Sequence, residues 1–304
     1  MLSSTDSVIN FIIKHNHIQL INCWGRRIYI FNDVLLQDQF IWNTSLLVGL
    51  TGIAALYSFL LHRYTKLKII CKQPVFFFLG LGLLFLCMGS PLKTISHLSF
   101  SLHMIQMSIL YFVVPPILLM GIPEDLFQRI WKISMVKELS KLLIPPRIAL
   151  IIFSILFLFY HLPVFLNVFS QNSVIHTVSI ILLLMLSFGM WWPMVSPDPM
   201  QRVSISQKKR YAILSGALLM PACLLFIFNA VTDGINNPFL TQITAHLCLP
   251  SSSTSFEILP PPFNTKLDQI IAGFLMLGIH KLTLMGTTRF HSERLNTQEE
   301  KFVS

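Results

Sequence analysis

Apolar residues in this chain gather in long runs that are separated by short polar segments. Seven of these runs approach the ~20 residues that an α-helix needs to cross the hydrocarbon core of a membrane. The pattern therefore predicts an all-α fold, an integral membrane bundle of seven transmembrane helices. The expected helices cover Trp42–Leu61, Val75–Pro91, Leu98–Leu119, Ile148–Phe169, Ile175–Trp192, Tyr211–Asn229 and Asp268–Thr287.

The same pattern divides the chain into three parts. Residues 1–39 are expected to form an extracytoplasmic or interfacial tail, residues 40–290 the membrane domain, and residues 291–304 a cytoplasmic tail. Pro115 and Pro116 predict a kink in the third helix, because proline cannot continue the backbone hydrogen bonding.

Composition supports the membrane assignment. The 304 residues are 54% hydrophobic and only 12% charged, whereas a soluble domain carries about 25% charged residues. The net charge of +9 does not indicate nucleic-acid binding, because the basic residues are dispersed at helix ends. The five cysteines form no CxxC pair, which gives no thiol-based metal motif. No nucleophile–base pairing or phosphate-binding loop is evident, so we do not expect an enzyme.

The basic residues also predict the orientation of the helices. Most of the 22 Lys and Arg residues fall on alternate connections and at the C-terminal end. Because basic residues are retained on the cytoplasmic side, we expect the N-terminus outside and the C-terminus inside. Cys23 and Cys248 then fall on the same side, where a disulfide between them is possible. Trp191 and Trp192 are expected to act as interfacial anchors.

Three histidines lie in or beside the apolar runs: His103, His161 and His176. An ionisable side chain inside a membrane is costly and is in itself a hypothesis of function. At ~1.5 Å per residue, His103 and His161 both lie ~10 Å below the outer face of a ~30 Å core. His176 lies at the outer mouth of the fifth helix. A transmembrane His can also serve only as a hydrogen-bonding group between helices, but two at matched depth favour a site.

Thioether and carboxylate groups accompany these imidazoles. Met107 follows His103 by one helical turn on the same face, and Asp268 lies at the outer end of the seventh helix. Imidazole with thioether is a ligand set that suits copper, and the soft thioether favours Cu(I). Asp268 has a second interpretation, as a carboxylate favoured by the helix dipole.

The remaining histidines have simpler interpretations. Met276 and His280 form a similar pair on the seventh helix, but His280 is deeper and lies next to Lys281, which favours a structural or interfacial role. His97 and His246 fall outside the membrane, where a metal could be captured, although a solvated role is favoured.

These residues belong to a series of motifs that resembles a known family, the polytopic CtaG-type cytochrome c oxidase assembly factors of bacteria. The resemblance extends over roughly residues 40–290, and the order and spacing of the motifs carry it. The matching stretches are Ser90–Leu92, Ser101–Met107, Pro115–Pro116, Gly121–Pro123, Phe159–Pro163, His176, Trp191–Pro193, Asp268–Gln269 and Gly273.

The resemblance implies a seven-helix protein of the bacterial cell membrane. Its implied role is the assembly of a haem–copper terminal oxidase, with delivery of copper to the catalytic subunit of that oxidase. His103, His161 and His176 match histidines of the family. This chain differs in having Met107 where many members have a second His, and Ser179 and Ile180 where many have an acidic residue and a His. A Met in place of a His keeps a copper ligand and softens the site.

The leading hypothesis is therefore a membrane-embedded assembly factor that binds copper transiently in the outer half of the bundle. Its expected metal residues are His103, Met107 and His161 as ligands, His176 as a gate, and Asp268 as an orienting carboxylate. The lipid bilayer and the oxidase subunit are the expected partners. Two alternatives stay open: a scaffold for oxidase assembly that binds no metal, and a haem- or chromophore-binding protein.

Overall fold

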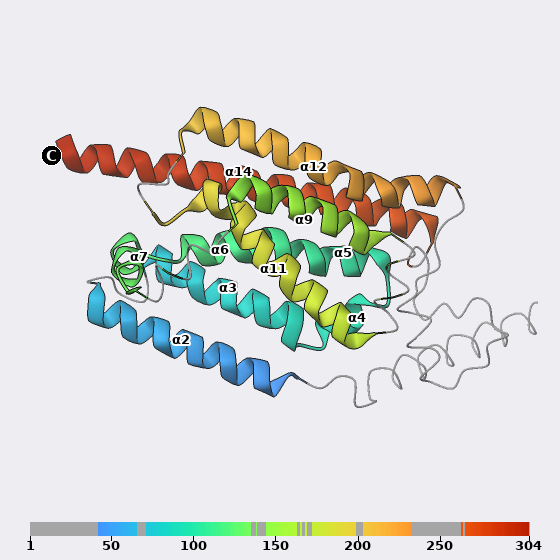
Figure 1. Ribbon diagram of the computed structural model, residues 1–304, viewed down its shortest axis with the longest axis horizontal. Helices are drawn as coiled ribbons and strands as arrows, with labels where there is room; N and C mark the ends of the chain where they lie inside the picture. Colours follow the sequence, from blue (N-terminus) through green and yellow to red (C-terminus); the bar gives the residue numbers. More distant parts are fainter. Residues whose placement is uncertain are drawn as a thin grey trace, which may run out of the picture.

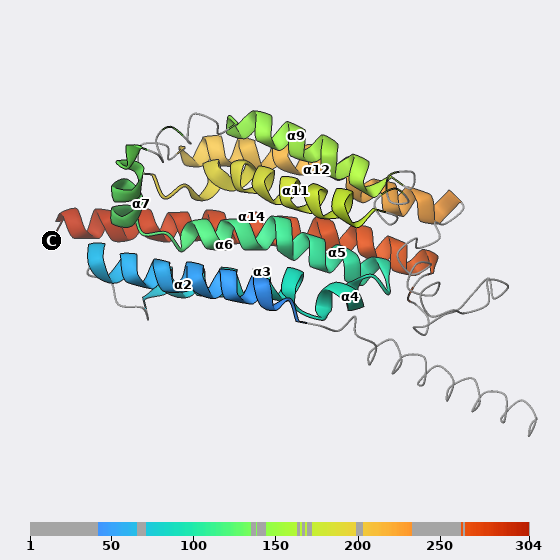
Figure 2. The same cartoon turned by 60° about the horizontal axis from the view of Figure 1, so that its bottom comes forward.

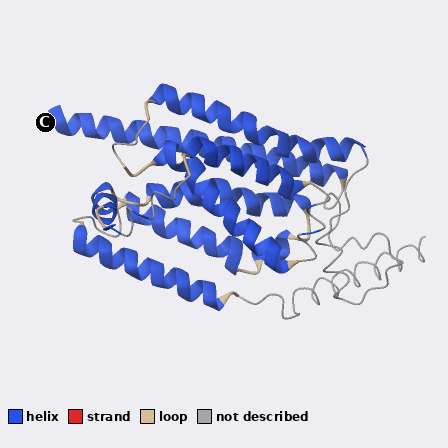
Figure 3. Ribbon diagram, in the orientation of Figure 1, coloured by secondary structure: helices blue, strands red, loops and turns tan. Residues whose placement is uncertain are grey.

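The computed structural model describes residues 42–65, 71–134, 138, 144–162, 165, 168, 172–198, 203–232, 263 and 265–303. Within these ranges the secondary structure is helical and contains no strand (Figure 3). The all-α prediction is confirmed for this part of the chain. The predicted N-terminal tail, Cys23, His246 and Cys248 lie outside the described residues.

The long helices run alternately up and down in one bundle, as both views show (Figures 1 and 2). Two short helices, α4 (Leu92–Ser96) and α7 (Glu124–Trp131), lie at opposite ends of it. The helices that form the body of the bundle are α2 (Thr44–Tyr64), α3 (Lys72–Gly89), α5 (Phe100–Ser108), α6 (Val114–Met120), α9 (Pro146–His161), α11 (Ser173–Val195), α12 (Ile205–Thr232) and α14 (Lys266–Val303).

Six helical segments of the described chain are long and apolar enough to cross a membrane. They are α2, α3, the continuous segment Phe100–Met120, α11 from Val174, α12, and α14 as far as Arg289. This makes the chain a multi-pass membrane protein. The count of seven spans and the outside N-terminus stay predictions.

The fourth predicted helix is shorter than expected. It was predicted to reach Phe169, but α9 ends at His161 after 16 residues, which is ~24 Å of helix. Leu162 is extended, with φ −70° and ψ 138°, because the residue before a proline is sterically driven out of the helical region. The helix therefore ends before the proline that follows Leu162 in the sequence, and His161 lies in its last turn.

Helices α5 and α6 form one central rod with a local defect where the sequence predicts a kink. A π-helical segment, Ile109–Val113, joins the two helices immediately before Pro115 and Pro116. Pro115 has no N–H for the carbonyl oxygen of Tyr111, four residues earlier. The indole Nε1 of Trp191 on α11 donates to that oxygen at 3.0 Å.

Trp191 thus corrects a sequence-based prediction. Its side chain is 1% exposed, so it is a core residue that supports the central rod and not an interfacial anchor. Its polar N–H made an interfacial position the simpler expectation, because a buried indole needs a hydrogen-bond acceptor. The proline-induced gap in the rod supplies one.

Candidate metal centre

The site is built on the first turn of α5, which the carboxylate of Asp268 holds in place. Asp268 lies in the first turn of α14 and is 1% exposed. It accepts hydrogen bonds from the backbone N–H groups of Phe100 at 2.9 Å and Ser101 at 3.2 Å. The hydroxyl groups of Ser99 and Ser101 also donate to it. A carboxylate at these unsatisfied donors is favourable, and it fixes the position of α5 against α14.

One turn into α5, an imidazole and a thioether face the interior of the bundle. His103 is 5% exposed and Met107 is 1% exposed. They are four residues apart, so they lie on the same helical face. Met104, also 1% exposed, lies next to His103. Neither candidate ligand of α5 faces lipid.

The second imidazole comes from the end of α9. His161 is fully buried, and its Nδ1 lies 2.6 Å from the carbonyl oxygen of Phe157. That contact requires the proton on Nδ1, which leaves Nε2 with a lone pair. Nε2 is buried and has no hydrogen-bond partner among the described residues. Metal-binding histidines in proteins are commonly oriented by such an Nδ1–H bond to a backbone carbonyl.

The third imidazole, His176, lies in the first turns of α11 and contacts α9. Its Nε2 is 3.0 Å from the hydroxyl oxygen of Tyr160. The Tyr160 ring centroid lies 6.3 Å from that of His103 and 5.2 Å from that of His161. Tyr160 therefore lies among all three predicted histidines, although the sequence analysis gave it no role.

His97 is a further residue of the site, and the sequence had favoured a solvated role for it over metal capture. It follows α4 and was expected to be solvated, but it is half-buried, with ring centroids 5.5 Å from His103 and 6.1 Å from His176. Burial, with smaller contributions from the charges of His176 and Lys93, lowers the pKa of the His97 imidazole to about 3. The ring is consequently neutral at neutral pH and retains a lone pair for a metal.

The result is a cluster of three buried imidazoles and one half-buried imidazole at one end of the bundle, formed by His103, His161, His176 and His97. In the conformation of the described residues, no three or more His, Cys, Asp or Glu side chains are placed to hold a metal ion together. A metal bound here would need a thioether ligand or a small rearrangement of the rings. Asp268 is already engaged with the first turn of α5, so its observed role is to position the helix that carries His103.

The deeper pair on α14 lies apart from this cluster. His280 packs against Phe112 and Trp191, with ring centroids at 4.9 and 6.0 Å, and its Nε2 lies 3.0 Å from the Ser215 hydroxyl. Met276 is fully buried. These contacts support the structural role that the sequence favoured for His280.

Comparison with protein families identifies the group to which this bundle belongs. Residues 55–288 match the family described as cytochrome c oxidase caa3 assembly factor. The chain is a member of this CtaG family. The match confirms the resemblance seen in the sequence and contains all four clustered histidines and Asp268. No curated protein and no solved structure matched the chain. The family has a role in oxidase assembly, which favours a non-catalytic protein.

Proposed function

We propose that this protein binds copper at the imidazole cluster and delivers it to the catalytic subunit of a haem–copper oxidase in the bacterial cell membrane. The observation that carries the proposal is the geometry of His161. Its Nδ1–H is held by the Phe157 carbonyl, and its lone-pair nitrogen is buried without a hydrogen-bond partner among the described residues. Burying such a nitrogen without a partner costs ~1–3 kcal/mol, and a bound metal ion would offset that cost.

The proposed copper ligands are the imidazoles of His103 and His161 together with the thioether of Met107. The exposed fraction is 5% for His103, 0% for His161 and 1% for Met107, so all three side chains are at least 95% buried. Thioether and imidazole ligands suit Cu(I), which is soft.

Copper delivery requires a path from this site to a partner. His97 and His176 are the other two imidazoles of the cluster, and the His97 ring centroid lies 5.5 Å from that of His103 and 6.1 Å from that of His176. We propose that they receive the ion from His103 as it leaves. Tyr160, which bonds to His176, would hold that imidazole until an incoming ligand displaces it.

Copper content of the purified protein tests the proposal. The protein is loaded with Cu(I), passed over a competing chelator and analysed for metal per chain by mass spectrometry. We expect stoichiometric copper in the unchanged protein and background copper in the double variant His103→Ala, His161→Ala. His280→Ala is the matched control, because it removes a buried imidazole outside the cluster, and it should keep its copper. Equal copper in the double variant and the control contradicts the ligand assignment.

A second candidate function is an assembly scaffold that binds no metal. Two observations favour it. The carboxylate of Asp268 already accepts a hydrogen bond from the backbone of α5. In the described part of the chain, no three His, Cys, Asp or Glu side chains are placed to hold a metal ion together. Oxidase assembly in cells that carry the double variant separates the two functions. Normal oxidase activity with that variant supports the scaffold, whereas loss of activity that added copper restores supports copper delivery.

A further inference from the structure

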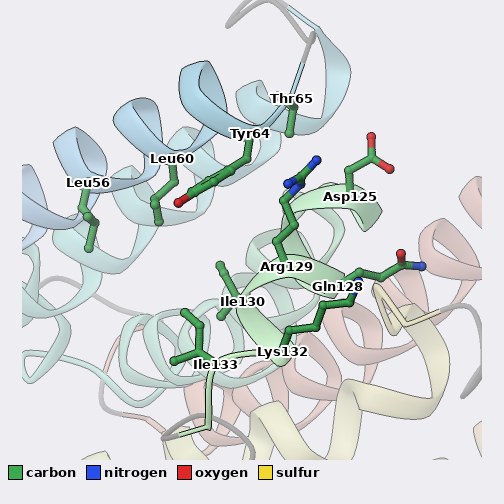
Figure 4. A pocket seen from close by; sticks show the side chains of 10 residues that line it. All are labelled: Leu56, Leu60, Tyr64, Thr65, Asp125, Gln128, Arg129, Ile130, Lys132 and Ile133. Atoms are coloured by element: carbon green, nitrogen blue, oxygen red, sulfur yellow. The ribbon is translucent and has the colours of Figure 1, made fainter.

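A second site lies near the opposite end of the bundle, in an open groove of 1140 Å³ between α2 and α7. Figure 4 shows the side chains of Leu56, Leu60 and Tyr64 pointing from α2 toward α7. These residues are spaced four apart and form one stripe along α2. The adjacent face of α2 carries Tyr57 and Leu61, which are buried in the bundle.

The walls of the groove are apolar and accessible. Leu56 is 57% exposed, Tyr64 is 40% exposed and, after α7, Ile133 is 51% exposed. Leu60 and Ile130 complete the apolar lining. In a membrane-embedded bundle such a stripe contacts acyl chains, and the end of α2 marks the level at which Tyr side chains meet the headgroups.

The rim of the groove carries an excess of positive charge. Arg129 and Lys132 of the α7 region line it, together with Gln128, Thr65 and a single carboxylate, Asp125. The guanidinium carbon of Arg129 lies 5.5 Å from the centre of the Tyr64 ring, and that of Arg63 lies 5.7 Å from the same ring. Cation–π contacts at this distance hold the two guanidinium groups beside the aromatic ring.

Helix α7 presents these charges because it is amphipathic. Leu126 and Phe127 are buried against the bundle, whereas Asp125, Gln128 and Arg129 are exposed. A short amphipathic helix at the end of a membrane bundle lies in the interface, with its basic residues at the headgroup level. The sequence predicts this end to be cytoplasmic, where anionic lipids attract clustered Lys and Arg.

We propose that this groove is a binding site for one anionic phospholipid. An acyl chain would lie along Leu56 and Leu60, and the phosphate would lie between Arg129 and Lys132, beside Tyr64. Arg129 and Lys132 line the groove against one carboxylate, and Arg63 lies beside Tyr64, which favours an anionic headgroup over a zwitterionic one. The apolar stripe favours a lipid over a soluble phosphate. The site is separate from the imidazole cluster and does not depend on copper binding.

Native mass spectrometry of the full-length protein tests the site. The protein is delipidated in detergent and offered phosphatidylglycerol and phosphatidylcholine in equal amounts. We expect one phosphatidylglycerol to be retained per chain. In the double variant Arg129→Gln, Lys132→Gln, the dissociation constant of this lipid should rise at least about tenfold, since each such charge contributes ~1 kcal/mol. The matched control is Lys209→Gln, Arg210→Gln, which removes two exposed charges from the start of α12; its binding should not change.

Three outcomes would overturn the proposal: equal retention of the two lipids, equal loss in the groove variant and the control, or no loss in the groove variant. Inorganic phosphate provides a further test on the unchanged protein. If millimolar phosphate displaces the lipid completely, the acyl chain contributes nothing, and the site is not a lipid site. The unfolding temperature of each variant without added lipid verifies that the fold is retained.

Discussion

At the scale of single residues, the site depends on polar groups that hold one another in place. Asp268 fixes the start of α5, Phe157 fixes the tautomer of His161, and Tyr160 contacts His176. In a membrane interior no water is available to these polar groups, so each of these hydrogen bonds avoids the cost of a polar group without a partner. The imidazoles are thereby oriented before any ligand arrives, which reduces the entropic cost of binding.

Tyr160→Phe tests this residue-scale organisation. The change removes the hydroxyl that lies 3.0 Å from His176 Nε2 and keeps the buried ring. We expect the free energy of unfolding to fall by about 1 kcal/mol, the size of a hydrogen bond between membrane helices. Unfolding by sodium dodecyl sulfate in mixed micelles measures the change. Tyr64→Phe, at a residue that is 40% exposed, is the control and should be neutral. A neutral Tyr160→Phe would show that the bond contributes nothing to stability.

At the scale of elements, the central rod has interrupted helical hydrogen bonds, and a neighbouring helix supplies a replacement donor. Two prolines interrupt its backbone hydrogen bonds, a π-helical segment precedes them, and α11 donates the Trp191 indole N–H to the carbonyl that Pro115 leaves without a helical donor. Segments of π-helix are often found at functional sites. Here the segment begins two residues after Met107, so the backbone change lies directly below the proposed copper ligands.

A double-mutant cycle tests the link between Trp191 and Pro115. Trp191→Phe removes the donor to the Tyr111 carbonyl and should cost about 1–3 kcal/mol, because a buried acceptor loses its partner. In a Pro115→Ala background the helix can supply its own N–H, so the same change should cost less. Unfolding free energies of the four proteins give the coupling. Additive effects would mean that the indole and the proline act independently. Trp192→Phe, at a partly exposed position, is the control.

At the scale of the whole molecule, the bundle has two chemically different ends. The imidazoles gather at the end that contains α4, and the cationic groove lies toward the end that contains α7 (Figure 1). The positive-inside rule predicts that the imidazole end is extracytoplasmic and the cationic end is cytoplasmic. Copper would then be handled on the outer side of the membrane, and the anionic lipid would be bound on the inner side.

Cysteine labelling tests this orientation. Single cysteines replace Val174, in the first turn of α11, and Lys209, in the first turns of α12, in a protein from which the native cysteines are removed. Both side chains are exposed, and the two helices begin at opposite ends of the bundle (Figure 1). A membrane-impermeant maleimide should label position 174 in intact spheroplasts, and position 209 only after the membrane is opened. The reverse pattern would place the imidazole cluster on the cytoplasmic side.

The sequence by itself determined the class of the protein and the positions of its helices. Apolar runs of membrane-spanning length are a property of local composition, because the bilayer acts on each segment separately. For the same reason the sequence indicated correctly that His103, His161 and His176 lie within or beside the helices, at one end of the bundle. The motifs also identified the family correctly. The sequence overestimated the length of the fourth helix, because it did not weigh the effect of Pro163 on Leu162.

Only the tertiary structure decided which polar groups meet. His97 joins the cluster because the corner between α4 and α5 turns it inward, and Tyr160 reaches His176 because α9 and α11 pack side by side. Asp268 caps α5 across more than 160 residues of sequence, and Trp191 is buried because Pro115 leaves an acceptor for its N–H. Such pairings depend on how the helices pack. The periodicity of one helix shows which of its own residues are buried, but it does not show which side chains of a neighbouring helix they will contact.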